Sequence, residues 1–195
     1  MLKLPRPWIT TSSERCYKMR EGSTGKDMLE GEEIDQANAD RIIRFMIEKR
    51  LTLGLAESVT AGGVSYRLTS IPGSSKVVKG GVVCYTRFAK EKLLNLAADL
   101  LDEQGTVSSD VAIALAEAAL KVFEADIGFG ITGNAGPSTD SDKSKVGQVY
   151  VAIASKDGDR KDKALDLFGP RETIRSKSIT EALRFIREYL MSKYI

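Results

Sequence analysis

Apolar residues recur every three or four positions near both ends of the chain, which predicts a helix at each end. The inward face of the first helix consists of Ala39, Ile42, Ile43 and Met46. Asp35 is the predicted N-cap of this helix, because a side-chain oxygen at that position can accept from free backbone amides. The last helix, predicted from about Thr173 to Lys193, has an inward face made of Ile174, Ile179, Leu183, Ile186 and Leu190.

Between these helices, short apolar runs and periodic segments alternate. Strands are predicted at about 51–56, 81–85, 126–131, 148–154 and 163–168, the last two as a hairpin around Asp157-Gly158. Helices are predicted at about 61–69, at 89–96 and after the cap Ser108-Ser109-Asp110. Strands alternating with helices predict an α/β fold, a single three-layer α/β/α domain with a mixed sheet. The alanine-rich helix after the cap and the glycines of 126–131 predict close helix–sheet contact.

The first 33 residues differ from the rest. They contain Pro5 and Pro7 and a turn-like stretch from Glu21 to Lys26, with few apolar residues at regular spacing. We therefore expect residues 1–33 to be an extension, irregular or partly mobile, and residues 34–195 to be the α/β domain.

The amino-acid composition excludes several classes of catalytic and metal-binding site. The 195 residues include no histidine, which excludes Ser-His-Asp triads, Cys-His pairs and His-based zinc sites. A net charge of +2 with no basic stripe argues against nucleic-acid binding, and no apolar run is long enough to cross a membrane. The N-terminus has no apolar core typical of a signal peptide, so Cys16 and Cys84 are expected to stay reduced in the cytoplasm. The carboxylates do not cluster, so no metal site is predicted.

Polar segments follow the predicted strands, where open α/β sheets bind ligands. The first, Ala56 to Gly63, puts the Ser58 hydroxyl near a helix N-terminus, where backbone amides can receive an anion or a developing oxyanion. In the second, Gly80 to Lys90, the strand ends at Tyr85 and the lysine lies one turn into the next helix. Both side chains can then point at one crevice.

The third segment, Ile131 to Pro137, has small residues suited to a backbone cradle for phosphate or carboxylate. Each segment also has a purely structural interpretation. Ser58 can be an ordinary N-cap, Lys90 a solvated surface lysine, and the glycines and proline common loop residues. Cys84 alternates out of phase with Tyr85, so we expect it to be a small core residue.

In this order and spacing, the segments resemble the C-terminal domain of the CinA family, from about residue 35 to the C-terminus. The family pattern runs A-E-S-C-T-G-G, R-L-T-x-x-P-G-S-S, G-G-V-V-x-Y-S-N-x-x-K, G-x-V-S, T-G-x-A-G-P, V-G-x-V and G-x-R. The matching residues here are Ala56-Glu57-Ser58 with Thr60 and Gly62, Arg67-Leu68-Thr69, Pro72-Gly73-Ser74-Ser75, Gly80 to Tyr85 with Lys90, Gly105 to Ser108, Thr132-Gly133 with Ala135-Gly136-Pro137, Val146-Gly147, and Gly169 with Arg171.

The resemblance implies a hydrolase that deamidates nicotinamide mononucleotide (NMN) to nicotinate mononucleotide and ammonia, without a cofactor. It implies Ser58 as the nucleophile. Because the chain has no histidine, our hypothesis is that Lys90, the best-placed alternative, is the base and that Tyr85 is a relay or substrate contact. Backbone amides at 59–62 would stabilise the oxyanion, and Glu57 would cap or orient its neighbours. The expected substrate-binding residues are Thr60, Gly62, Thr132, Gly133, Ala135, Gly136 and Arg171, together with Arg87, which departs from the family pattern.

A lysine base at neutral pH needs its pKa lowered by about three units, which corresponds to roughly 4 kcal/mol. A second cation beside it, such as Arg87, would act in that direction. Arg87 stands where the family has Asn, and it could instead bind a substrate phosphate.

Other departures from the pattern are Val59 in place of the family's Cys, Ala61 in place of the first Gly, Thr86 in place of Ser, and 138–142 in place of a glycine-rich insert. An alanine at a positive φ costs about 1 kcal/mol, which residue 61 avoids only if it is helical.

These departures leave two alternatives to the amidase. One is a catalytically silent relative that binds a nucleotide or a protein. The other is a structural or regulatory protein linked to DNA uptake or damage, as the family's name suggests. Exposed helices with small residues favour a homo-oligomer.

Overall fold

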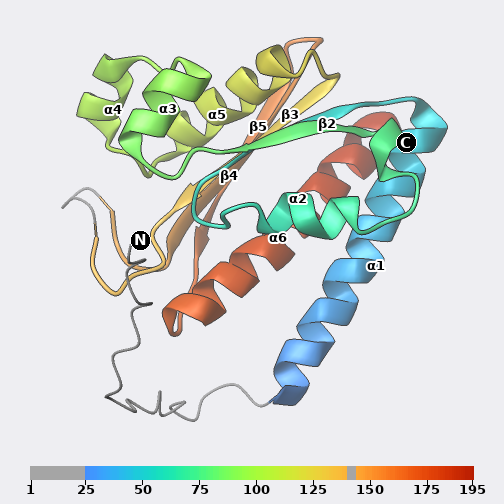
Figure 1. Ribbon diagram of the computed structural model, residues 1–195, viewed down its shortest axis with the longest axis horizontal. Coiled ribbons are helices and arrows are strands. Elements are labelled where there is room, and N and C mark those ends of the chain that lie inside the picture. Colours follow the sequence, from blue (N-terminus) through green and yellow to red (C-terminus); the bar gives the residue numbers. More distant parts are fainter. Residues whose placement is uncertain (1–24, 140–143) are drawn as a thin grey trace, which may run out of the picture.

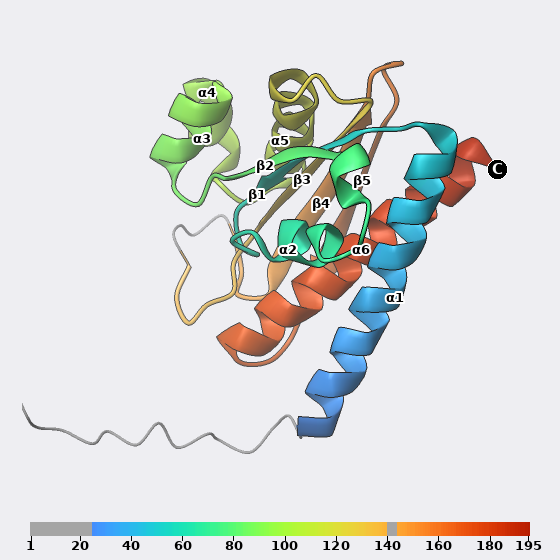
Figure 2. The ribbon, with the colours of Figure 1, turned by 45° about the vertical axis from the view of Figure 1, so that its right-hand side comes forward.

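The computed structural model describes residues 25–139 and 144–195, with side chains from Gly31 onward. Five strands form one sheet in the order β2-β1-β3-β4-β5. They are β1 (Leu53–Glu57), β2 (Val78–Val83), β3 (Ile127–Gly133), β4 (Gln148–Ser155) and β5 (Arg160–Asp166). Helices α1 (Gly25–Lys49), α2 (Gly63–Thr69) and α6 (Arg171–Tyr194) cover one face of the sheet, and α3 (Arg87–Leu94), α4 (Ala98–Gln104) and α5 (Ser109–Val122) cover the other (Figures 1 and 2). The predicted three-layer α/β/α domain with a mixed sheet is confirmed.

Strand direction determines where the polar segments lie. Strand β1 is parallel to both β2 and β3, with Glu57 paired to Val83 on one side and to Ile131 on the other. Strands β4 and β5 run antiparallel to their neighbours and form the predicted hairpin. Because the carboxyl ends of β1, β2 and β3 share one edge, the segments that follow them come together there.

The two faces of β1 explain the two helical layers. Leu53 and Leu55 belong to the apolar core beneath α1, α2 and α6, whereas Ala56 packs in the core beneath α3, α4 and α5. The glycines of β3 allow the close contact that the sequence predicts. A Cβ atom on Gly128 would lie 2.0 Å from the carbonyl oxygen of Ala116, so only glycine lets α5 approach this closely.

Three sequence predictions about helices need correction. Helix α1 begins at Gly25, so Asp35 lies inside the helix rather than at its N-cap, and residues 25–33 are helical rather than irregular. Residues 1–24, the rest of the predicted extension, lie outside the described residues. The boundary between the extension and the domain, at residues 33 and 34, stays a prediction. The short helix α4 carried too few periodic residues to be predicted, and α2 begins two residues later than expected.

Asp35 packs inward because Arg67 on α2 lies beside it, with 3.6 Å between Oδ2 and Nε. The carboxyl group is buried, and Oδ1 has no hydrogen-bond partner among the described residues. Burial raises the pKa of Asp35, although the charge of Arg67 opposes the change. Arg67, one of the motif residues, therefore connects α2 to α1.

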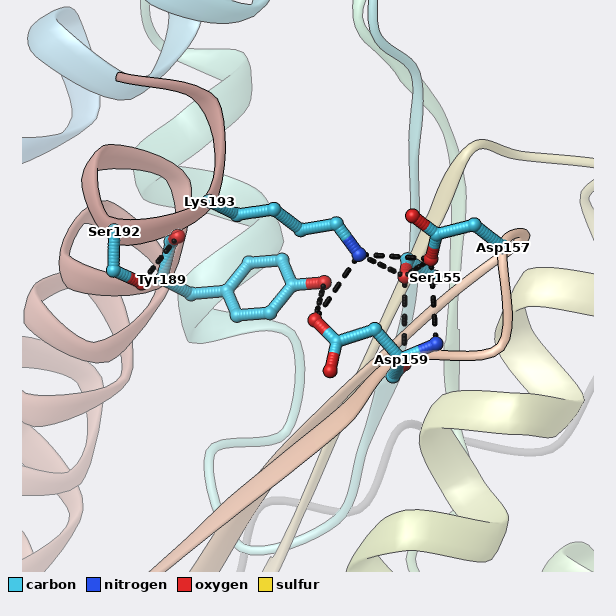
Figure 3. Close-up of polar contacts among 6 residues, drawn as sticks. All are labelled: Ser155, Asp157, Asp159, Tyr189, Ser192 and Lys193. Carbon is cyan, nitrogen blue, oxygen red and sulfur yellow. Dashed lines mark hydrogen bonds and ion pairs between the residues drawn. The ribbon is translucent and has the colours of Figure 1, made fainter.

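The end of α6 is held by a polar cluster that we call the Lys193 clamp, made of Ser155, Asp157, Asp159, Tyr189 and Lys193 (Figure 3). Lys193 Nζ lies 2.8 Å from Asp157 Oδ1 and 3.0 Å from Asp159 Oδ2. The Tyr189 hydroxyl also donates to Asp159 Oδ2, at 2.9 Å. The clamp connects the last turns of α6 to the hairpin between β4 and β5.

Within the described ranges, no helix is long and apolar enough to cross a membrane.

Candidate active site

A cavity of about 270 Å³ opens at the carboxyl ends of the three parallel strands. Its volume is close to the lower end of the range for small-molecule sites, ~300 Å³. The residues that line it come from all three predicted polar segments, from the loop before α5 and from the start of α6. They are Ser58, Val59, Tyr85, Lys90, Thr106, Val107, 132–138 and Arg171.

Ser58 and Lys90 meet at this cavity. Lys90 extends from the first turn of α3 and donates to Ser58 Oγ at 3.0 Å and to the carbonyl oxygen of Cys84 at 2.9 Å. The lysine is 1% exposed and the serine 5% exposed, so the contact is shielded from bulk water. Thr86 caps α3 by accepting from the Ala89 amide, which sets the direction in which α3 begins. Lys90 is therefore not the solvated surface lysine of the structural interpretation.

Tyr85 and Arg171 lie at the rim. Arg171 donates from Nη2 to the Tyr85 hydroxyl at 2.8 Å and from Nη1 to the carbonyl oxygen of Gly136 at 2.7 Å. Tyr85 is half exposed. One guanidinium thus connects α6, the segment after β2 and the loop after β3.

The loop after β3 forms one wall, as predicted from Thr132, Gly133, Ala135 and Gly136. The Thr132 hydroxyl donates to the carbonyl oxygen of Thr106 at 2.7 Å, which joins this wall to the segment before α5. Five lining residues were not predicted to be site residues from the sequence, namely Thr106, Val107, Asn134, Pro137 and Ser138. The first two belong to the G-x-V-S match, which was the available signal.

Glu57 organises the turn after β1. The side chain is 1% exposed, and its two oxygens accept five hydrogen bonds. The donors are the hydroxyls of Thr60 and Ser65 and the backbone amides of Gly62, Val64 and Ser65. A carboxylate at the N-terminus of α2 satisfies the free amides of its first turn. The predicted structural role of Glu57 is confirmed.

This arrangement corrects two predicted substrate contacts. Thr60 is buried with its hydroxyl bonded to Glu57 at 2.7 Å, and the Gly62 amide is bonded to the same carboxylate at 3.0 Å. Neither residue lines the cavity. Both residues are bonded to Glu57 because this carboxylate directly precedes the turn and folds back over it.

The predicted oxyanion donors are reduced from four amides to two. The Ala61 amide donates to the carbonyl oxygen of Ser58 at 3.0 Å, and the Gly62 amide donates to the Glu57 carboxylate. The amides of Val59 and Thr60 make no backbone hydrogen bond within the described part of the chain. Ala61 has a φ of 51°, so residue 61 is left-handed rather than helical and bears the expected strain.

Arg87 is a third predicted substrate contact that lies away from the cavity. Its guanidinium lies 2.7 Å from Glu91 and 2.6 Å from Asp102, and it is not among the residues that line the cavity. Its guanidinium is directed away from the cavity because both acidic partners lie on the outer surface of α3 and α4.

Cys84 is buried, as predicted, and its Sγ lies 3.4 Å from the carbonyl oxygen of Glu57. Burial raises the pKa of the thiol, although the charge of Lys90 opposes this. The protonated thiol is a poor nucleophile. Among the described residues, no group of three or more Cys, Asp or Glu side chains could hold a metal ion.

A second hollow, of about 860 Å³, lies between α1 and α6, away from the strand ends. It is lined by apolar side chains such as Phe45 and Leu190 and by charged ones. Its only lining hydroxyl, within the described residues, is that of Ser192, which donates to the carbonyl oxygen of Tyr189. It therefore offers no nucleophile with a base.

Comparisons with known proteins agree with the fold and with the family resemblance. The family model of the CinA C-terminal domain matches residues 35–190. A CinA-like protein of Geotalea uraniireducens is 41% identical over 163 residues, which cover 84% of this chain and 38% of that protein. A CinA-like protein of Geobacter sulfurreducens is 41% identical over 151 residues, covering 77% of this chain and 36% of that protein. The chain thus spans less than two-fifths of the length of these relatives.

The matching solved structures are chains that this domain covers almost completely. The competence/damage inducible protein CihA of Agrobacterium tumefaciens has a TM-score of 0.76 at 32% identity, covering 81% of this chain and 96% of that one. A CinA superfamily protein of Escherichia coli has a TM-score of 0.76 at 27% identity, covering 80% of this chain and 90% of that one.

Proposed function

The chain belongs to the CinA C-terminal domain family, and from this premise we propose that it is an amidohydrolase that converts NMN to nicotinate mononucleotide and ammonia. The observation that carries the proposal is the buried contact of 3.0 Å between Lys90 Nζ and Ser58 Oγ. A hydroxyl within hydrogen-bond distance of a proton acceptor is the arrangement that nucleophilic catalysis requires. The choice of substrate rests on the family resemblance.

The reaction proceeds in two halves. In the proposed mechanism Lys90 first loses a proton to solvent, so that its amine can accept the proton of Ser58 as Oγ attacks the carboxamide carbon and the C=O π electrons move to the oxygen. As the tetrahedral intermediate collapses, the C–N bond breaks and the lysine gives its proton to the leaving nitrogen, which departs as ammonia. Water then attacks the acyl ester, Lys90 takes its proton, and the same proton returns to Ser58 Oγ as the acid is released.

The backbone amide of Val59 stabilises the oxyanion, because Val59 directly follows the nucleophile and lines the cavity. Thr60 does not line the cavity, and the amides of Ala61 and Gly62 are already bonded. A backbone donor directed at a developing oxyanion typically contributes a factor of about 10²–10³ in rate.

The walls of the cavity orient the substrate. Its volume of about 270 Å³ suits the carboxamide and ring of the nucleotide, with the ribose phosphate at the rim near Arg171. Tyr85 is half exposed beside this arginine, and its ring can contact the pyridine face. The predicted homo-oligomer and cytoplasmic location stay predictions.

The test measures ammonia release from NMN by the purified chain. Ser58→Ala should lower kcat by at least about 10³-fold and Lys90→Met by at least about 10²-fold, with melting temperature recorded for both. Lys92→Met is the matched control, because Lys92 lies two residues further along α3 and is exposed. Unchanged turnover in Lys90→Met would remove the assigned base.

Binding without turnover in the wild-type chain would favour the alternative of a catalytically silent relative. Isothermal titration of wild type with NMN separates this outcome from the absence of any interaction.

A further inference from the structure

We infer that Arg175 is a positioning residue for Ser58, because it holds the backbone of the turn that follows the nucleophile. This inference rests on the proposed function and deepens it. Arg175 lies on α6, one turn after Arg171, so both arginines extend from the same face of the helix. Arg171 lines the cavity, whereas Arg175 does not.

The contacts of Arg175 are with two consecutive carbonyl groups. Its Nε donates to the carbonyl oxygen of Val59 at 3.2 Å, and its Nη2 donates to that of Thr60 at 3.5 Å. The ion pair with Glu172 is longer, at 3.8 Å, and that carboxylate is 85% exposed, so it contributes little. The backbone of the turn is thus the principal partner of this guanidinium.

Because the peptide group is planar, a hydrogen bond to a carbonyl oxygen also determines the direction of the amide that follows it. In a trans peptide the C=O and the following N–H lie in one plane and point in opposite directions. A hydrogen bond to the Val59 carbonyl therefore fixes the Thr60 amide to point away from Arg175, and it holds the peptide plane next to the Val59 amide, the proposed oxyanion donor. The bond to the Thr60 carbonyl likewise fixes the Ala61 amide, which donates back to the Ser58 carbonyl at 3.0 Å.

The turn needs this support because it is strained. Ala61 has a φ of 51°, a conformation that costs an alanine about 1 kcal/mol or more. Glu57 holds the turn by accepting from the Thr60 hydroxyl and the Gly62 amide, and Arg175 holds it by donating to the carbonyl oxygens of Val59 and Thr60. A backbone held at positions before and after residue 61 can retain a strained geometry that would otherwise relax.

The experiment compares Arg175→Gln and Arg175→Lys with wild type and with the control Arg184→Gln. Arg184 lies on the same helix and pairs with Glu181. Arg175→Gln should lower kcat by about tenfold to a hundredfold with little change in KM, because the substrate-binding walls are intact. Arg175→Lys should retain part of the rate, because an ammonium can still donate to one carbonyl. Arg184→Gln should match wild type.

Hydrogen exchange of the peptide covering residues 58–62 is the readout that does not depend on turnover. Arg175→Gln should speed exchange in this segment without lowering the melting temperature enough to unfold the domain. If wild type releases no ammonia, the proposed function fails, and the exchange result alone decides the positioning role. Unchanged exchange, an unchanged kcat in an active enzyme, or an equal loss in Arg184→Gln would overturn the inference.

Discussion

Arg171 donates a hydrogen bond of 2.8 Å to the hydroxyl of Tyr85, a residue 86 positions earlier in the chain. The same guanidinium holds the carbonyl oxygen of Gly136, so the rim of the cavity depends on one side chain. Tyr85→Phe removes one hydrogen bond and should raise KM for NMN about fivefold, since such a bond contributes about 1 kcal/mol.

Arg171→Met removes both bonds and should lower kcat/KM by about a hundredfold or more. Steady-state ammonia assays give both values. Lys177→Met, on the same helix, is the control, because Lys177 contacts only the Phe168 carbonyl among the described residues. Equal effects of Tyr85→Phe and Arg171→Met would contradict the joint role of the guanidinium.

Glu57→Gln should destabilise the domain by about 3 kcal/mol. Five donors surround the carboxylate, and the amide group of glutamine would place N–H groups against some of them. Urea denaturation followed by circular dichroism measures the free energy of unfolding. A loss of activity with no loss of stability would instead indicate that Glu57 takes part in chemistry.

Ala61→Gly should raise the free energy of unfolding by about 1 kcal/mol. The substitution removes the penalty of a left-handed alanine, and the greater flexibility of glycine in the unfolded chain offsets only part of the gain. Gly62→Ala is the matched control, because Gly62 has a φ of 93° and alanine there should be destabilising. Equal unfolding midpoints for the two variants would show that the turn relaxes around residue 61.

Lys193→Met should lower the melting temperature at neutral pH but not in strong acid. Hydrogen bonds from Lys193 hold the pKa of both Asp157 and Asp159 below the usual value. Carboxyls with a lowered folded-state pKa add stability above the unfolded value of about 4, and this stability is lost as the pH falls through the folded values.

The gap in melting temperature between wild type and Lys193→Met should therefore be present at pH 7 and narrow below about pH 4. Thermal scans by circular dichroism at several pH values measure it, with Lys177→Met as control. A gap that stays constant across this range would show that the Lys193 clamp acts through packing rather than charge.

Local sequence predicted the layers and the strand ends well, because periodicity depends on which face of each element is buried. It failed at the start of α1, where Asp35 resembles a cap but is buried against Arg67 on α2. A local pattern cannot distinguish an aspartate that caps a helix from one whose partner lies on another helix.

The sequence by itself determined the α/β architecture, the exclusion of histidine chemistry and the strand ends at which Ser58, Tyr85, Lys90 and Thr132 lie. Only the tertiary structure decided which polar residues face the cavity. Thr60 and Gly62 are bonded to Glu57, and Arg87 to acidic groups on the surface, although all three are near the strand ends in sequence. The physical reason is competition for hydrogen bonds, because each polar group binds the partner that folding brings nearest, and sequence spacing does not specify that partner.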